Sequence, residues 1–278
     1  MIFFCGQYQL DLTKPQVMGI VNVTPDSFSD GGRYASTSRA VEHALQLVEE
    51  GANILDIGGE STRPGAVPTN LDEELSRVIP VIEALVKVVN IPLSIDTYKP
   101  QVMQAAIAAD ISMVNDIKAL QELSALELVA KSDVGICLMH MQGSPKTMQI
   151  NPQYVDVIAE VKAFLTARLQ ALIAAGIDKN RILLDPGFGF GKRTEHNVTL
   201  LQQLARIRDI GQPLLVGLSR KSVLGQVLGD NQADRVSASI AASVIAVMNG
   251  ANVLRVHDVK ATVDALKVVK AIQCFELS

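Results

Sequence analysis

Several side chains that could bind a flat polar ligand stand directly after short apolar segments of the sequence. Asp96 and Asp185 each end such a segment, and Asn115 ends another. Their carboxylate and amide groups can accept from and donate to the N–H and C=O edges of a planar heterocycle such as a pyrimidinone. Helix capping is the alternative role for the aspartates, but Pro100 delays the next helix after Asp96, and Pro186 with a glycine-rich segment follows Asp185. The sequence therefore predicts a binding site for a flat, nitrogen-containing ligand.

Cationic side chains at the ends of other apolar segments indicate an anion site. Arg220 and Lys221 stand where a helix should begin. Cations there oppose the helix dipole by ~0.3–1 kcal/mol each, so we expect them to serve an anion or an electron-rich ligand. Arg255 and His257 alternate at the end of the last segment, and alternate residues of a strand face the same side. Arg63 has a guanidinium that fits an anion, although a loop arginine is more often simply solvated.

Asn22 is a candidate metal ligand. It ends the first apolar segment, where its neutral oxygen could enter the shell of a Mg²⁺ ion that otherwise keeps water and phosphate oxygens. The Asp and Ser residues that follow it are explained as well by a polar turn.

Other familiar catalytic patterns are not matched. Residues 187–192 are rich in glycine, but Pro186 stands where a Walker phosphate loop needs glycine, and Arg193 stands where it needs Ser or Thr. The sequence has no zinc-type cluster and no nucleophile with a neighbouring base. We expect His140 to be a core histidine with a hydrogen-bonded ring. The chemistry should therefore depend on positioning and electrostatics.

The repetition of apolar segments and polar ends predicts the fold. Longer helical stretches separate the segments, as in βα units whose parallel strands are buried on both faces. Eight such units predict an α/β fold, the (β/α)8 or TIM barrel, in which the C-terminal ends of all strands meet at one mouth. The polar ends lie at Asn22, 56–63, Asp96, 115–116, His140, Asp185, 219–221 and 255–257.

The remaining segments fit around this barrel. Residues 1–14 predict a hairpin turning at Gly6 that covers the N-terminal end of the barrel, and residues 15–278 form the barrel itself in one domain. Apolar residues at helical spacing predict an outer ring of helices. Long loops in a compact barrel are usually functional. They are predicted at the mouth, at residues 24–36, 61–70 and 141–152.

Composition agrees with one cytoplasmic domain. The chain has 278 residues, 48% of them hydrophobic, and such barrels typically have ~250 residues. A net charge of −4 gives no reason to expect nucleic acid or membrane as a partner. The start lacks the features of a signal peptide, and the apolar run at 238–248 is too short to span a bilayer. We expect Cys5, Cys137 and Cys274 to be reduced thiols.

Eight motifs occur in a fixed order along the chain. They are GIVNVTPDSFSDGG from Gly19, DIGGESTRPGA from Asp56, SIDTYKP from Ser94, VNDI from Val114, MHMQGSPKTMQ from Met139, DPGFGFGK from Asp185, GLSRKS from Gly217 and RVHDV from Arg255. Any one can occur elsewhere, but together they are specific. In them the sequence resembles the dihydropteroate synthases of folate biosynthesis over nearly its whole length. The resemblance implies a TIM-barrel transferase that joins 6-hydroxymethyl-7,8-dihydropterin diphosphate to p-aminobenzoate, releases pyrophosphate, uses Mg²⁺ and is inhibited by sulfonamides.

The resemblance also implies a role for each candidate residue. Catalysis falls to Asp96, Lys221 and Arg255. The pterin is held by Asp96, Asn115, Met139, Asp185, Phe190, Gly217, Lys221 and Arg255. The diphosphate meets Asn22 through the metal, and Thr62, Arg63, Arg255 and His257 directly. The aminobenzoate meets Phe28, Pro64, Phe190, Lys221 and Ser222.

A base that could activate the amine does not stand out, so the residues favour a dissociative substitution in which the carbon–oxygen bond breaks before the amine attacks. Loops 24–36 and 61–70 would then close over the intermediate. The family resemblance suggests a homodimer through the late helices, including residues 238–248, although burial within one subunit explains the same residues equally well.

Two other functions fit part of this pattern. A pterin-dependent methyltransferase shares the Asp, Asn and Asp at strand ends but has no use for a diphosphate site made by Arg63, Arg255 and His257. An inert pterin-binding barrel predicts loss of the Asn22 loop or of Lys221, and both are present.

Overall fold

A computed structural model describes residues 1–24, 32–61 and 65–273 of the chain. In these residues eight parallel strands form one sheet in the order β8-β7-β6-β5-β4-β3-β10-β9. A parallel bridge between Leu184 and Leu214 joins the two ends and closes the barrel, as predicted. The strands are β3 (Gln16–Asn22), β4 (Ile54–Gly58), β5 (Leu93–Asp96), β6 (Met113–Asp116), β7 (Gly135–Met139), β8 (Ile182–Asp185), β9 (Leu215–Val216) and β10 (Val253–Val256).

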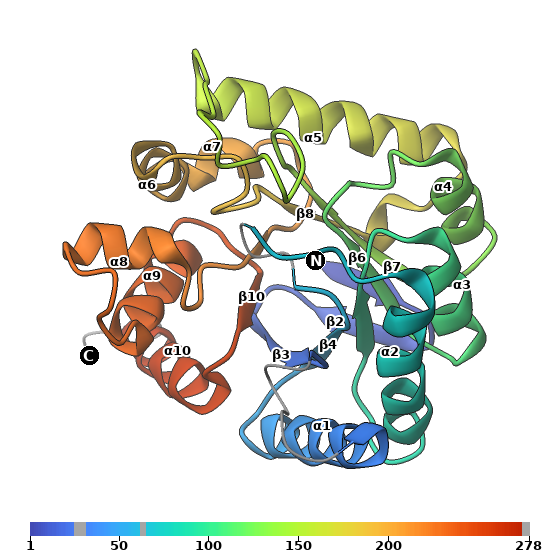
Figure 1. The fold of residues 1–278 in the computed structure, drawn as a ribbon. Coiled ribbons are helices and arrows are strands. Elements are labelled where there is room, and N and C mark those ends of the chain that lie inside the picture. Colours follow the sequence, from blue (N-terminus) through green and yellow to red (C-terminus); the bar gives the residue numbers. More distant parts are fainter. Residues whose placement is uncertain (25–31, 62–64, 274–278) are drawn as a thin grey trace.

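Helices surround the strands (Figure 1). Local signals fix several of their starts: Asn70 accepts a hydrogen bond from the Glu73 amide before α2, and Pro100 opens α3. The helices are α1 (Gly32–Glu49), α2 (Leu71–Leu85), α3 (Pro100–Ala108), α4 (Leu123–Ala130), α5 (Val157–Ala174), α6 (Thr194–Gln202), α7 (Leu204–Arg208), α8 (Ser222–Leu228), α9 (Val236–Met248) and α10 (Val259–Gln273), with a short 3-10 turn, η2 (Lys179–Arg181), before β8.

One predicted loop is shorter than expected. Residues 24–36 were predicted as a loop, but α1 begins at Gly32, so the last part of this segment is helical. The prediction was wrong there because residues 32–36 carry no apolar spacing that marks a helix. Residues 65–70 and 141–152 contain no helix or strand, as predicted. Within the described helices, none has the length and apolar character needed to cross a membrane.

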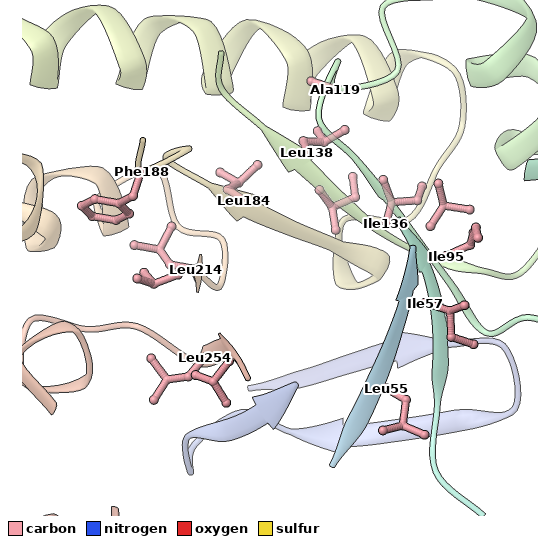
Figure 2. Packing of buried hydrophobic residues seen from close by; sticks show 14 of the residues in the cluster. Leu55, Ile57, Ile95, Ala119, Ile136, Leu138, Leu184, Phe188, Leu214 and Leu254 are labelled. Carbon is pink, nitrogen blue, oxygen red and sulfur yellow. The ribbon is translucent and has the colours of Figure 1, made fainter. Parts of the chain in front are cut away.

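The main core lies between the sheet and the helices. Figure 2 shows side chains that leave the outer face of the strands, among them Leu55 and Ile57 of β4 and Ile136 and Leu138 of β7. Alternate residues of each strand face outward, and the helices bury them. The sheet is therefore covered on its outer face, and the remaining alternate residues face the inside of the barrel.

The hairpin β1 (Ile2–Cys5) and β2 (Tyr8–Asp11) closes the N-terminal end of the barrel, which confirms the prediction. A Cβ atom on Gly135 would lie 2.6 Å from the Phe3 ring, so glycine is required where β7 meets the hairpin. Phe3, Cys5 and Leu12 pack in one buried cluster with the inward residues Met18, Ile54, Met113, Cys137, Leu183, Leu215 and Val253. Cys5 and Cys137 are free and buried, while Cys274 lies outside the described residues.

Candidate active site

The polar residues of the site lie one step above this apolar cluster. Residues two positions apart on a strand face the same side, so each inward apolar residue is followed by an inward residue nearer the mouth. Those residues are polar or glycine on several strands. The pairs are Ile54 and Asp56, Met113 and Asn115, Leu183 and Asp185, Leu215 and Gly217, and Val253 and Arg255.

Four neighbouring strands bring predicted residues together at the mouth. Asn22, Gly58, Asp96 and Asn115 are register partners across β3, β4, β5 and β6. A Cβ atom on Gly58 would lie 3.7 Å from Oδ2 of Asp96 and 3.9 Å from Oδ1 of Asn22. Gly58 therefore leaves the space between Asn22 and Asp96 without a side chain.

A hydrogen-bonded network links β4, β5, β6 and β10 inside the barrel, and we call its members Asp56, Asp96, Asn115 and Arg255 the pocket floor. Arg255 donates from Nε to Oδ2 of Asp56 over 2.5 Å and from Nη2 to Oδ2 of Asp96 over 2.6 Å. Asn115 donates from Nδ2 to the same Oδ2 of Asp56 over 3.0 Å. Asp56 is fully buried, so it bonds the side chains of Asn115 and Arg255 from inside the barrel.

Burial changes the pKa values of ionisable side chains in and beside the floor. It raises the pKa of Asp96 to about 7, with Arg255 opposing the shift and Asp56 adding to it. Burial also raises the pKa of Asp185 and lowers that of Lys221 to about 8. Burial tends to lower the pKa of Arg255, but the nearby carboxylates of Asp56 and Asp96 have the larger effect, so the pKa of Arg255 is raised. In their charged forms, Asp96 and Asp185 can each stabilise a ligand that becomes positive.

An apolar wall stands beside the floor. Met139 and Phe190 pack with Ile117 and Met148 in a buried cluster near the mouth. Nζ of Lys221 donates to the Phe188 carbonyl and lies 4.6 Å from the centre of the Phe190 ring. A Cβ atom on Gly217 would lie 3.8 Å from the Arg255 Cβ and 3.9 Å from Nζ of Lys221. The missing side chain at Gly217 leaves room between the two cations.

The glycine-rich segment after β8 is a structural loop. A Cβ atom on Gly187, whose φ is +70°, would lie 1.8 Å from the His140 carbonyl oxygen. Nζ of the buried Lys192 donates to the carbonyls of Gly187 over 2.8 Å and Phe190 over 3.0 Å, and lies 2.9 Å from Nδ1 of His140. His140 is thus the buried, hydrogen-bonded histidine that we predicted. Burial, and then Lys192, lower its pKa to about 3.

The anion side of the mouth is only partly as predicted. Nδ1 of His257 lies 3.0 Å from Oγ of Ser219, which also accepts the backbone N–H of His257. Lys221 precedes α8, and Ser222 is the exposed first residue of this helix. The expectation that Arg220 serves the ligand as Lys221 does was wrong, because its guanidinium binds both carboxylate oxygens of Asp258.

Four predicted residues, Phe28, Thr62, Arg63 and Pro64, lie outside the described residues. Among residues 1–24, 32–61 and 65–273, no group of three or more His, Cys, Asp or Glu side chains could hold a metal ion. Mg²⁺ does not need such a group, since it keeps several waters and takes one or two protein oxygens besides phosphate. The half-buried amide of Asn22 at the mouth fits that requirement.

Comparison with known proteins decides the family. A family described as "Pterin binding enzyme" matches residues 18–257. The dihydropteroate synthase of Escherichia coli strain K12 is 51% identical over 98% of this chain and 96% of its own length. The chain belongs to the dihydropteroate synthase family.

Solved structures of dihydropteroate synthases share the whole fold. The Yersinia pestis enzyme, in a structure with a sulfonamide drug complex, is 49% identical, with a TM-score of 0.93 over 99% of this chain and 100% of that one. The Xanthomonas albilineans enzyme with 4-aminobenzoic acid is 53% identical, with the same TM-score over 99% of both chains. As a dihydropteroate synthase the chain is a transferase. Its identity to these synthases over nearly its whole length favours the synthase over the methyltransferase alternative.

Two buried groups of this synthase were not predicted to act in the site. Asp56 was seen only as the start of a polar segment, although the alternation of Ile54, Asp56 and Gly58 already placed it on the inner face of β4. Lys192 was included only in the glycine-rich range 187–192, with no role of its own. Its bonds to Gly187, Phe190 and His140 lie in the folded chain, and no spacing in the sequence signals them.

Proposed function

We propose that the mouth of this barrel condenses 6-hydroxymethyl-7,8-dihydropterin diphosphate with p-aminobenzoate to give 7,8-dihydropteroate and pyrophosphate. The observation that carries the proposal is the pocket floor, in which Arg255 bonds Asp56 and Asp96 and Asn115 bonds Asp56. Pyrophosphate release that requires both substrates is the direct test. Release with the pterin diphosphate alone would contradict a condensation.

The pterin ring is assigned to the floor and the wall. Oδ1 of Asp185 already accepts the Gly187 amide over 2.7 Å, so Oδ2 is the oxygen that accepts a ring N–H. Asp96, Asn115 and Lys221 supply the other polar contacts. Met139 and Phe190 contact the faces of the ring, Gly217 gives it room, and Arg255 stacks on it.

The diphosphate is assigned to the opposite side of the mouth. Arg255 in β10 and His257, which directly follows this strand, are two residues apart and are assigned to the diphosphate. Thr62 and Arg63, which lie outside the described residues, are assigned to it from the family resemblance alone. Asn22 would hold Mg²⁺ there, and the bound ion would neutralise charge on the leaving pyrophosphate.

The aminobenzoate is assigned to the start of α8. Its carboxylate is assigned to Ser222, and its ring to Lys221 and Phe190. Phe28 and Pro64, which lie outside the described residues, are assigned to the ring from the family resemblance alone. Sulfonamides would occupy the same place and compete with it. Inhibition that aminobenzoate relieves, in a steady-state assay, is the expected behaviour.

The charge distribution supports a dissociative substitution. The carbon–oxygen bond breaks and its electron pair leaves with pyrophosphate, while the dihydropterin becomes cationic beside the Asp96 carboxylate. The neutral amine then adds to the exocyclic carbon and loses its proton. The floor carboxylates are assigned to the pterin and to Arg255, and none is assigned as a base, because an aromatic amine is already a neutral nucleophile.

Oxygen isotope exchange tests this order of events. With pterin diphosphate labelled at the bridging oxygen, the label should scramble into non-bridging positions before aminobenzoate is added. Aminobenzoate should bind appreciably only when pterin and pyrophosphate are both present. Absence of scrambling, together with tight aminobenzoate binding to the empty enzyme, would support direct displacement instead.

We further propose that the enzyme is a cytoplasmic homodimer. The small residues of α9, such as Ala242 and Ala246, are buried within the subunit, but Ile245 and Met248 on the same helix are 45% and 67% exposed. Val268 and Ile272 of α10, which lies next to α9 in Figure 1, are 60% and 72% exposed. Both helices therefore carry exposed apolar side chains, which suits contact with a second copy. Sedimentation should give a dimer that Ile245→Glu weakens. A monomeric wild-type enzyme would contradict the proposal.

A further inference from the structure

Asp56 is a buried charged group that the reaction described above does not contact. It lies in the middle of β4, between the apolar Ile54 below and Gly58 at the mouth, and it is fully buried. Burying a carboxylate costs several kcal/mol unless its bonds are well made. Both hydrogen bonds found for its side chain in the described residues go to the floor residues Asn115 and Arg255, through Oδ2, while Oδ1 has no partner there.

For Asn115 the consequence is a fixed amide orientation. A carboxylate can only accept hydrogen bonds, so the Asn115 group that faces Asp56 must be the N–H of Nδ2. A flipped amide would place two acceptor oxygens against each other in a buried site. Asp56 therefore decides which end of the Asn115 amide faces the ligand, although it does not touch the ligand itself.

For Arg255 the consequence is a fixed guanidinium plane. Asp56 holds Nε and Asp96 holds Nη2, over 2.5 Å and 2.6 Å. These two bonds tie adjacent corners of the planar group to β4 and β5, 199 and 159 residues away in the chain. Charge-assisted bonds of this kind are roughly twice as strong as neutral ones, so the plane that stacks on a ring is set from below.

We propose that Asp56 is a positioning residue, which holds the Asn115 amide and the Arg255 guanidinium in the orientation in which they meet the pterin. This inference rests on the proposed function, since it concerns the same site. Removal of the Asp56 carboxylate should therefore weaken pterin binding through Asn115 and Arg255, rather than through loss of the fold.

Two substitutions separate the acceptor from the charge. Asp56→Leu has a similar size and removes both acceptor oxygens, and it should lower kcat/KM for the pterin diphosphate on the order of a hundredfold. Asp56→Asn keeps one acceptor oxygen and loses the charge, so it should lower kcat/KM only about tenfold. Full activity in both variants would overturn the proposal. The wild-type rate of pyrophosphate release with both substrates, measured in parallel, reports separately on the proposed function.

Asp116→Asn is the matched control. Asp116 is an equally buried carboxylate beside Asn115, but its oxygens accept the backbone amides of Lys118 and Leu120 and do not reach the floor. This variant should unfold at lower urea concentration and keep the kcat/KM of the wild type. A loss of kcat/KM equal to that of Asp56→Asn would mean that any buried charge nearby matters, and would overturn a specific role for Asp56.

Double-mutant cycles test whether Asp56 acts through its partners. Affinity for a pterin without diphosphate is measured by calorimetry for Asp56→Asn in the wild-type, Asn115→Ala and Arg255→Ala backgrounds. The loss caused by Asp56→Asn should be smaller in each background than in the wild type, because the partner that it positions is already missing. Equal fold losses in all three backgrounds would show that Asp56 acts independently of both residues. Because none of these comparisons uses Asp56→Leu, they stand even if that variant fails to fold.

Discussion

Replacing Asp185 by asparagine should weaken pterin binding and leave the fold intact. In the wild type, Oδ1 of Asp185 accepts the Gly187 amide over 2.7 Å, and Oδ2 is left for the ligand. Asparagine has one side-chain oxygen, and the fixed Gly187 amide is its nearest donor. The NH₂ group would then face a ring N–H, so the variant places a donor against a donor.

The size of the effect follows from the bond that is lost. A hydrogen bond to a charged group contributes ~1.5–3 kcal/mol. At ~1.4 kcal/mol for each tenfold change in affinity, the variant should bind pterin about ten to a hundred times more weakly. Stability should not fall, because the single side-chain oxygen of asparagine can still accept the Gly187 amide, which is the protein hydrogen bond that Asp185 makes through Oδ1.

Calorimetry with a pterin that lacks the diphosphate isolates this contact, and urea unfolding checks the fold. Asp264→Asn, which removes an exposed carboxylate on α10 paired with Lys260 and Lys267, is the control and should leave the affinity unchanged. Unchanged pterin affinity in a folded Asp185→Asn variant would remove Asp185 from the pocket.

Three further predictions concern the rest of the site. His257→Ala should weaken pyrophosphate binding much more than binding of unphosphorylated pterin, whereas Arg255→Ala should weaken both; equal losses at His257 would indicate a structural role. Gly187→Ala should lower the urea midpoint sharply, because its Cβ would lie 1.8 Å from the His140 carbonyl oxygen, and an unchanged midpoint would contradict this loop geometry. Below pH 6.5 the unfolded state protonates His140 while the folded state, with a pKa of about 3, does not. As the pH is lowered from 6.5, the unfolding free energy of the wild type should therefore decrease by about 1.4 kcal/mol more per pH unit than that of His140→Gln. Parallel pH profiles of the two unfolding free energies would refute this.

The sequence was sufficient for the barrel and for most strand ends at the mouth. Buried parallel strands appear as apolar runs, so Asp96, Asn115 and Asp185 could be placed at one mouth before any coordinates were known. A local sequence pattern does not show which distant residue a polar side chain will bond. The bond from Arg255 to Asp56 joins residues 199 positions apart, and the neighbouring cations Arg220 and Lys221 look alike in sequence although only one faces the pocket.

The start of α1 illustrates a second limit. Residues 32–36 contain Gly, Arg, Tyr, Ala and Ser, which show neither helical nor strand spacing. A helix can extend through such a segment once its later turns are packed, because propagation needs only one more bond per residue. Periodicity therefore predicts that a helix exists better than it predicts where that helix begins.

The closure of the barrel has a consequence for how the chain is made. The last strand, β10, pairs with the first, β3, and the Asn252 side chain bonds both the Leu12 carbonyl and the Leu214 amide. During synthesis the earliest barrel strand must therefore wait, with one edge unpaired, until nearly the whole chain has left the ribosome. Arg255 arrives on that final strand and completes the pocket floor. A nascent chain that stops before residue 253 therefore has an open sheet edge, a template for aggregation, and no functional site.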